Sequence, residues 1–379
     1  MQLRRSTLKQ AALSAAVVLG VLLTAAAPAV SSDWPSFLKD QANSSYALRS
    51  PIPPLRLKWK FTSGGPVYSS PVVSDGRVFV GSYDKFLYAL DAETGDKLWS
   101  FATEGEILST PAVRDGAVYF GSKDGFVYAV DASTGGLKWK YKTGGEVLSS
   151  PAVGDGLVFV GSQDLYTYAL DAATGKRRWR FRLSDYEKYS GIYASPAYSA
   201  KTVYVAGKNG SVYAASSRSG GRRWKYRTKS AIYASPVVSG NSLFIASYDR
   251  TLYVIDLSNG KLRWRKRLDG DWVYASPVVA GENIYVAFKT GEIKVYDRRK
   301  GIKKASFKLP GGISSTPALT VSQTMYVGCE DGNVYAIGAL TGSIYWKYRT
   351  NGPIHSSPAV TSSAVYTAST DGSVYAFGR

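Results

Sequence analysis

The sequence predicts an all-β fold built as an eight-bladed propeller, and three observations support this class. Tyrosine, valine, tryptophan and 38 glycines are abundant while methionine occurs only twice, which is the composition of strands and tight turns. A phrase ending in tryptophan, as in Ala89 to Trp99, recurs along the chain. A small residue followed by proline returns with spacings of 40, 40, 45, 40, 41, 40 and 41 residues, a period typical of propeller blades. These prolines are Pro71, Pro111, Pro151, Pro196, Pro236, Pro277, Pro317 and Pro358.

Residues 1–29 have the layout of an export signal. Arg4, Arg5 and Lys9 precede an apolar run that ends in small residues, so we predict cleavage and a periplasmic or extracellular protein. An uncleaved anchor is the less favoured alternative. The segment from Arg4 resembles the twin-arginine motif except at Thr7, which leaves that route and ordinary secretion open. No cysteine follows the run, so we do not expect a lipoprotein.

Residues 30–54 form a proline-punctuated lead-in, in which we expect Trp34 and Phe37 to pack across one end of the fold. Residues 55–379 are predicted to be the propeller. The last repeat stops at Arg379 after its third strand, while residues 55–61 are an orphan fourth strand that carries Trp59. Pairing of the two would complete the eighth blade and remove both free sheet edges.

Each repeat parses into four short strands, which in the first repeat are 70–73, 77–81, 86–90 and 97–101. Turns are expected at Ser74 to Gly76 and at Asp91 to Gly95. Between the second and third strands we predict a two-residue turn with positive φ angles, as in Asp124-Gly125. The recurring aspartates at these turns are therefore interpreted as structural rather than catalytic.

The recurring phrase reads Ala-x-Asp-x-x-Thr-Gly-x-x-x-Trp, and its copy from Val295 to Ala305 has lost the tryptophan. The phrase resembles the tryptophan-docking motif of PQQ-like, quinoprotein-type propellers, over roughly residues 33–379. In this resemblance the tryptophans hold one blade to the next. They are Trp59, Trp99, Trp139, Trp179, Trp224, Trp264 and Trp346.

The resemblance implies two kinds of function. The family includes alcohol and glucose dehydrogenases that depend on pyrroloquinoline quinone (PQQ), and the outer-membrane β-barrel assembly lipoprotein, which binds protein partners without a cofactor. Alcohol-oxidising members carry two adjacent cysteines and a calcium held by Glu, Asn and Asp. The chain has one cysteine, Cys329, and one histidine, His355, which excludes that pair and any metal centre based on several Cys or His residues.

We therefore expect a monomeric binding or assembly scaffold in the cell envelope, with no catalytic residue, metal or cofactor. Its partner would be an envelope protein or peptide. The alternative is a compact quinoprotein that binds PQQ with calcium in the axial mouth and oxidises an alcohol or sugar. Cys329 is interpreted as a small packed residue, and no reaction is assigned to His355.

The formal charge is +19, and removal of three signal cations leaves 19 − 3, or +16. Fourth strands such as Arg178 to Arg182 alternate cations with aromatic residues, so the cations point outward and protect the blade edges. The other interpretation is salt-sensitive adhesion to an anionic polymer or lipid surface. The charges are spread round the circumference without a nucleic-acid motif, so we expect no sequence-specific nucleic-acid binding.

Residues three and five positions before each proline vary between repeats and are predicted to ring one mouth of the axis, aromatic on one side and acidic on the other. They either bind a small ligand or a peptide tail, or simply plug the channel. The candidates are Tyr68, Glu106, Glu146, Tyr193, Tyr233, Trp272, Tyr274 and His355. One repeat has five extra residues, and this loop adds the contact candidates Tyr186, Glu187 and Tyr189.

Overall fold

The computed structural model describes residues 33–183 and 191–379, and all regular elements in these ranges are β-strands. The predicted export signal and the loop candidates Tyr186, Glu187 and Tyr189 lie outside the described residues. Ser32–Arg379 forms one compact unit. In the part of the chain that the structure describes, no helix is long and apolar enough to cross a membrane.

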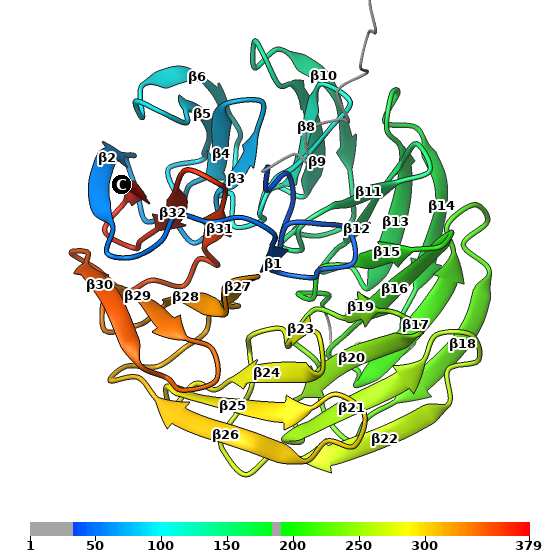
Figure 1. The fold of residues 1–379 in the computed structure, drawn as a ribbon. Helices are drawn as coiled ribbons and strands as arrows, with labels where there is room; N and C mark the ends of the chain where they lie inside the picture. The colour runs from blue at the N-terminus through cyan, green and yellow to red at the C-terminus, as the bar shows by residue number, and fades with distance from the viewer. Residues whose placement is uncertain (1–32, 184–190) are drawn as a thin grey trace, which may run out of the picture. The chain divides into compact units, whose positions relative to one another are not determined.

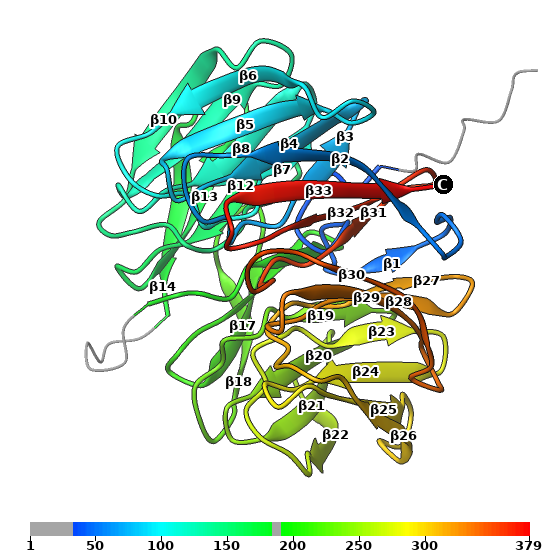
Figure 2. The same ribbon diagram turned by 90° about the vertical axis from the view of Figure 1, so that its left-hand side faces the viewer.

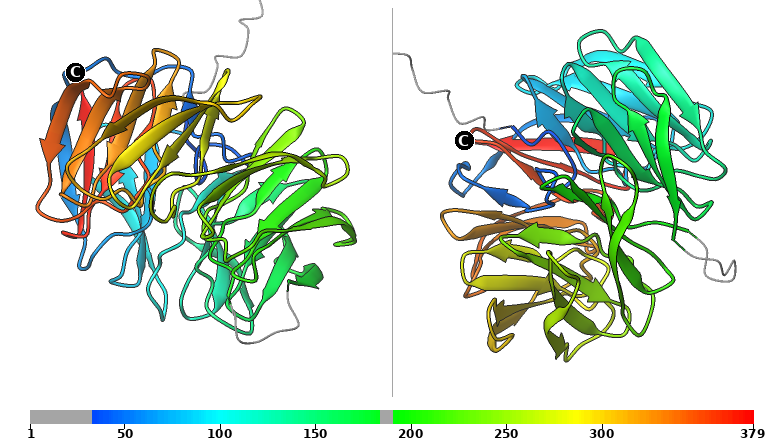
Figure 3. Two further views of the ribbon diagram at one scale, coloured as in Figure 1. Left: turned by 90° about the horizontal axis from the view of Figure 1, so that it is seen from below. Right: turned by 90° about the vertical axis from the view of Figure 1, so that its right-hand side faces the viewer.

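Seven blades are each built from four consecutive antiparallel strands, and they follow one another round a ring (Figures 1 and 3). The first four blades comprise β3 (Val72–Ser74), β4 (Arg77–Gly81), β5 (Phe86–Asp91) and β6 (Lys97–Ala102); β7 (Ala112–Arg114), β8 (Ala117–Gly121), β9 (Phe126–Asp131) and β10 (Leu137–Lys142); β11 (Ala152–Gly154), β12 (Leu157–Gly161), β13 (Tyr166–Asp171) and β14 (Arg177–Arg182); β15 (Ala197–Ser199), β16 (Thr202–Ala206), β17 (Ser211–Ser216) and β18 (Arg222–Arg227). The next three comprise β19 (Val237–Ser239), β20 (Ser242–Ser247), β21 (Thr251–Asp256) and β22 (Leu262–Arg267); β23 (Val278–Ala280), β24 (Asn283–Ala287), β25 (Glu292–Asp297) and β26 (Lys303–Lys308); β27 (Ala318–Thr320), β28 (Thr324–Gly328), β29 (Asn333–Gly338) and β30 (Ile344–Arg349).

The eighth blade joins the two ends of the propeller. Its inner strands are β31 (Ala359–Val360), β32 (Val365–Ala368) and β33 (Ser373–Gly378), and its outer strand is β2 (Arg56–Thr62) from the start of the fold. β2 and β33 are antiparallel and lie side by side in Figure 2, with Trp59 opposite Ala376. The prediction of an eight-bladed propeller closed by an N-terminal strand at about 55–61 is confirmed.

The two hairpin turns of a blade differ from each other. Asp75 and Gly76 join β3 to β4 with φ angles of 49° and 70°, a two-residue turn that matches the strand twist. The predicted two-residue turn between the second and third strands is wrong, because four residues, Ser82 to Lys85, join β4 to β5. Only the last of them has a positive φ, 74° at Lys85. The Asp84 carboxylate stabilises this longer loop by accepting the backbone N–H of Phe86 at 3.1 Å.

A closed belt of hydrogen bonds explains the small residue before each proline. The backbone N–H of Ser70 donates to the hydroxyl of Thr110 in the next blade, and the last member, Ser357, donates back to the hydroxyl of Ser70. All eight bonds are 2.9 to 3.1 Å long. Because these N–H groups are buried, each requires an acceptor, and Ser or Thr supplies it. The eight members are Ser70, Thr110, Ser150, Ser195, Ser235, Ser276, Thr316 and Ser357.

The recurring tryptophans pack on the glycine of the phrase in the following blade. The Trp99 indole N–H donates to the carbonyl of Ala132 at 3.2 Å, and its ring covers Gly135. Gly135 has a φ of 75°, and a Cβ there would lie 2.7 Å from the ring, so both conformation and space require glycine. Other copies with this indole hydrogen bond are those of Trp59, Trp139, Trp179 and Trp224.

The copy of the phrase from Val295 to Ala305 lacks the tryptophan, but its strand still places an aromatic ring on the glycine of the next blade. Ala305 stands in the tryptophan position of β26, opposite Val295. Two residues later on the same face of the strand, the Phe307 ring packs against Gly342 of the next blade. The loss of the tryptophan in the sequence is therefore compensated by an aromatic ring from a neighbouring position.

The lead-in crosses one end of the ring, as Figure 1 shows for the segment around β1 (Tyr46–Ala47). Trp34 is only 2% exposed and forms a bridge to Val73, while Phe37 is half-buried. β1 pairs in parallel with β27 and extends that sheet to five strands. Further backbone N–H groups that donate to the lead-in belong to Val113, Tyr198, Val238, Leu319 and Val321. These contacts all lie at the carboxyl ends of inner strands, so the loops that precede the inner strands lie at the opposite end.

Candidate functional site

The mouth candidates lie on the loops that precede the inner strands, at the end opposite the lead-in. The structure adds a third set of side chains beside them, one from each loop between the second and third strands. Backbone hydrogen bonds join these loops to the loops that precede the inner strands, as from the N–H of Tyr83 to the carbonyl of Pro66 at 3.0 Å. The set comprises Tyr83, Lys123, Gln163, Lys208, Tyr248, Lys289, Glu330 and Thr370. Sequence reasoning missed it, although its variation beside a mostly constant Ser and Asp was a usable signal.

The four predicted aromatic residues Tyr193, Tyr233, Trp272 and Tyr274 meet on one side of the mouth. Tyr248, which was not predicted, joins them as a fifth. Tyr248 stacks on Trp272 with a centroid distance of 4.9 Å and an interplanar angle of 16°. Tyr233 contacts Tyr193, Tyr248 and Tyr274 at 5.9, 5.5 and 5.6 Å. Tyr193, Trp272 and Tyr274 remain 41%, 44% and 36% exposed. We call these five residues the aromatic cluster; it offers an apolar surface with hydroxyl groups to a partner.

One hydroxyl of the aromatic cluster, that of Tyr248, is held in its neutral form by its surroundings. The hydroxyls of Tyr248 and Tyr274 lie 3.5 Å apart, and this hydrogen bond, with burial, raises the pKa of Tyr248 to about 12. The Lys208 ammonium lies 4.8 Å from the ring centroid of Tyr193 and 5.7 Å from that of Tyr233. Such cation–π contacts favour a lysine over the ring faces. The cluster thus combines phenol hydroxyls with one cation at its border.

The side predicted to be acidic is partly neutralised. The Glu106 carboxylate lies 3.8 Å from the Lys123 ammonium, which also lies 4.9 Å from the ring centroid of Tyr83. Tyr83 in turn packs on Tyr68 at 4.9 Å. Glu146 is exposed, and among residues 33–183 and 191–379 it has no ion-pair partner. The two glutamates therefore do not form one acidic surface.

His355 joins a polar chain at the mouth. Its Nδ1 lies 2.7 Å from the Ser314 hydroxyl and 3.6 Å from the Glu330 carboxylate, which pairs with Lys289. Both contacts use the same ring nitrogen, whereas a serine–histidine–acid relay uses the two nitrogens separately. Tyr68 stacks on the His355 ring at 5.3 Å. The arrangement positions His355 without activating Ser314 as a nucleophile.

The pH dependence of stability should change near neutral pH when His355 is replaced by Gln. Burial lowers the pKa of His355 below its usual value of 6.5; the Glu330 charge opposes this effect and Lys289 adds to it. The unfolded state therefore binds a proton more readily, so stability is expected to fall as pH drops through about 6.5 and to level off below the folded pKa. His355 is the single histidine of the chain, so the His355→Gln variant should show a flatter profile in this window. Urea unfolding between pH 7.5 and 5.5 measures it, and identical slopes would contradict the prediction.

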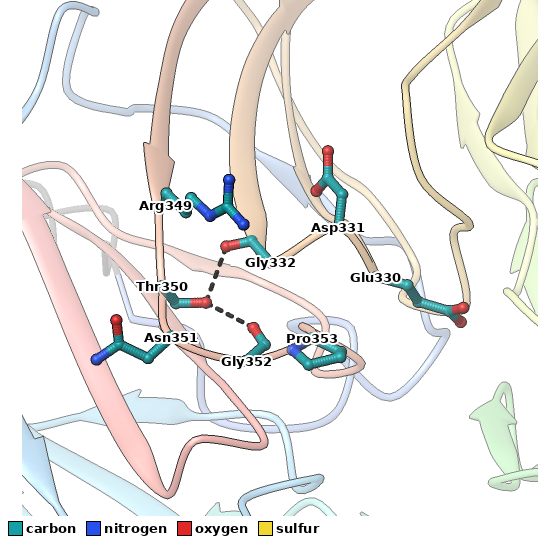
Figure 4. Close-up of a pocket in the computed structure, with 8 residues that line it drawn as sticks. All are labelled: Glu330, Asp331, Gly332, Arg349, Thr350, Asn351, Gly352 and Pro353. Carbon is teal, nitrogen blue, oxygen red and sulfur yellow. Dashed lines mark hydrogen bonds between the residues drawn. The ribbon is translucent and has the colours of Figure 1, made fainter.

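Two equivalent notches open at the rim of the mouth. In the β27–β30 blade a notch of about 470 Å³ is lined by Glu330 to Gly332 and by Arg349 to Pro353 (Figure 4). The Thr350 hydroxyl at its base lies 2.8 and 2.7 Å from two glycine carbonyls. The β15–β18 blade has a notch of about 280 Å³ in the same position, lined by Lys208, Asn209, Arg227, Thr228, Lys229, Ser230 and Ala231. The two differ in charge, since the first has two carboxylates and the second has three cations.

The outward-pointing cations of the outer strands are partly paired within several blades. The cations that directly precede the tryptophans of several outer strands contact the aspartate that ends the preceding strand, as Arg178 contacts Asp171 at 2.7 Å and Arg263 contacts Asp256 at 2.6 Å. Exposed pairs of this kind contribute little stability. The cations that follow the tryptophans, such as Arg180 over the Tyr166 ring at 4.4 Å, remain exposed on the edge strands.

Two observations bear on the calcium and quinone arrangement that the resemblance implies, and no reaction step is derived through it. Trp272, a mouth residue on whose ring a quinone could stack, already has Tyr248 on one face. Within the described ranges no three Asp, Glu, His or Cys side chains gather as a metal site. Cys329 is buried, and burial raises the pKa of its thiol to about 11, so it is an unreactive packed residue.

Comparison with solved structures shows the same fold in proteins with different functions. BamB from Moraxella catarrhalis matches with a TM-score of 0.75 at 19% identity, over 86% of this chain and all of the other. A europium-containing methanol dehydrogenase matches with a TM-score of 0.82 at 16% identity, over 92% and 98%. The quinohemoprotein alcohol dehydrogenase of Comamonas testosteroni matches with a TM-score of 0.80 at 17% identity, over 91% and 80%. At these identities the likeness concerns the fold alone.

Family models are more specific. The search of curated proteins found no match to this chain. The model for the outer membrane protein assembly factor BamB matches residues 56–110. The model for the β-propeller of the beta-alanine-activating enzyme matches residues 153–378, more than half of the chain. The chain therefore belongs to the family of PQQ-like β-propellers that this model describes.

Proposed function

We propose that this protein is an exported scaffold that binds a protein partner in the cell envelope through the aromatic cluster at its mouth, without catalysis of its own. The observation that carries the proposal is the gathering of Tyr193, Tyr233, Tyr248, Trp272 and Tyr274 on one side of the ring. Tyrosine and tryptophan are the residues that most often dominate protein–protein binding energy.

Three features support a protein partner. The exposed rings lie on loops held by the rigid ring, so binding costs little ordering entropy. Their hydroxyls can form hydrogen bonds at the edge of an apolar contact. The match of residues 56–110 to an outer membrane protein assembly factor favours the same class of role, and the export signal predicted at residues 1–29 agrees with an envelope location.

Crosslinking in envelope extracts tests the proposal. The mature protein should capture a defined partner at moderate salt, and the Trp272→Ala/Tyr274→Ala variant should lose about 10-fold or more of that capture, since two exposed anchors are removed. The matched control is Tyr345→Ala, an exposed aromatic residue on β30. Equal capture by the double variant, or recovery of salt-labile anionic polymers alone, would overturn the proposal.

The alternative remains a compact quinoprotein that oxidises an alcohol or sugar, and the exposed face of Trp272 is the observation that favours it. The purified protein is mixed with PQQ and calcium, and its melting temperature and the reduction of an artificial electron acceptor are followed. On the scaffold proposal neither changes. A raised melting temperature with substrate-dependent reduction would replace the scaffold by the dehydrogenase.

A further inference from the structure

The notch of the β15–β18 blade has the character of an anion site. Lys208, Arg227 and Lys229 line it, and among the residues that the structure describes its lining contains no carboxylate. Within residues 33–183 and 191–379 none of these three side chains has an ion-pair partner. The Asp249 carboxylate on the next blade is engaged elsewhere, since it accepts the backbone N–H of Lys229 at 2.9 Å and the Tyr253 hydroxyl at 2.7 Å.

A comparison between blades shows that a structural carboxylate is replaced at this notch. In six blades an aspartate in the loop between the second and third strands accepts a tyrosine hydroxyl, at 2.5 to 2.7 Å. Here Asn209 occupies that position. Its amide donates to the Leu183 carbonyl at 2.7 Å, and the Tyr213 hydroxyl donates to the same carbonyl. The loop is thus held without a negative charge, whereas the equivalent notch keeps Asp331 and adds Glu330.

The notch is continuous with the aromatic cluster. Lys208 lines the notch and also lies over the rings of Tyr193 and Tyr233. Ala231 lines the notch as well, and its carbonyl accepts the backbone N–H of Tyr248 at 2.8 Å. Cationic and aromatic surfaces therefore meet along one short stretch of the rim.

We propose that this combined surface binds an acidic peptide segment of the partner, with a carboxylate side chain in the notch and a neighbouring aromatic or apolar side chain on the aromatic cluster. The proposal rests on the proposed function and specifies the chemistry of the partner. The notch has a volume of about 280 Å³ and is lined by Lys208, Arg227 and Lys229. Unpaired cations around it attract a carboxylate and form charge-assisted hydrogen bonds with it.

Fluorescence anisotropy with the full mature chain tests the proposal. The probe is a labelled short peptide that alternates aspartate with phenylalanine, and the reference peptides carry asparagine for aspartate or alanine for phenylalanine. The asparagine peptide loses the charge-assisted hydrogen bonds and the alanine peptide loses the contact with the aromatic cluster, so each should bind about 10-fold or more weakly. The Lys208→Gln/Lys229→Gln variant should show the same loss for the acidic probe. The matched control is Arg349→Gln in the equivalent notch, which should bind as the unmodified protein does.

Three outcomes would overturn the inference. The first is equal affinity for the aspartate and asparagine peptides, and the second is an equal loss in the Arg349→Gln control. The third is stronger binding of single-stranded DNA or of anionic phospholipid vesicles, lost in the same lysine variant, which would assign the notch to another polyanion. If the acidic probe fails while Trp272→Ala/Tyr274→Ala still abolishes partner capture, the inference fails and the proposed function stands.

Discussion

Replacement of Phe377 by alanine is expected to lower the free energy of unfolding by about 3–5 kcal/mol, the usual cost of removing a buried phenylalanine from a core. Phe377 is 0% exposed on β33, the strand that pairs with β2 and closes the ring. Its ring centroid lies 5.0 Å from that of Trp346 and 4.8 Å from that of Tyr348 in the neighbouring blade. The cavity would thus form at the closure of the ring. Urea unfolding of the mature protein measures the loss.

The matched control for this prediction is Tyr345→Ala. Tyr345 lies on β30 in the same neighbouring blade but is 53% exposed, so its removal should cost less than about 1 kcal/mol. Because opening the closure exposes two strand edges, Phe377→Ala should also aggregate more readily on heating. Similar losses in both variants would show that β33 does not carry the closure.

Substitution of Gly135 by alanine should destabilise the protein by about 2–5 kcal/mol, the sum of two costs. A positive φ, here 75°, costs a residue with a side chain about 1–2 kcal/mol. The added methyl would lie 2.7 Å from the Trp99 ring, and overpacking of this kind costs about 1–3 kcal/mol.

Gly116 separates the two costs. It has a φ of 71°, but a methyl there would meet nothing within 4 Å. Gly116→Ala should therefore lose only the conformational part, and the difference between the two variants in urea unfolding measures the docking of Trp99 on the next blade. If both variants lose the same free energy, the tryptophan does not need the glycine surface.

Much of the fold could be predicted because each blade repeats the same local chemistry. The proline period, the alternating strands and the orphan strand with Trp59 were sufficient for the blade count and the closure. The four-residue loop at Ser82 to Lys85 was mistaken for a two-residue turn, because Asp and Gly are favoured in both. The compensation of Ala305 by Phe307 was missed since it depends on a ring reaching a different blade.

The candidate site was predicted only in part. The register of the repeats placed Tyr193, Tyr233, Trp272 and Tyr274 on one side of the mouth, but Tyr248 comes from a different loop and enters the cluster through a backbone hydrogen bond to Ala231. The pairing of Glu106 with Lys123 likewise joins separate loops. The cationic notch also escaped notice, because its lining comes from two loops that are distant in the sequence.

The sequence by itself determined that this protein is an all-β propeller of eight blades closed by its own ends. Strand periodicity and turn chemistry are local properties, and they recur in every repeat. The tertiary structure alone decided which side chains share a surface: Tyr248 with Trp272, Lys208 with Arg227, and the lead-in across one end. The physical reason is that the ring brings together loops from different strands and blades, and contacts between them depend on the geometry of closure rather than on spacing along the chain.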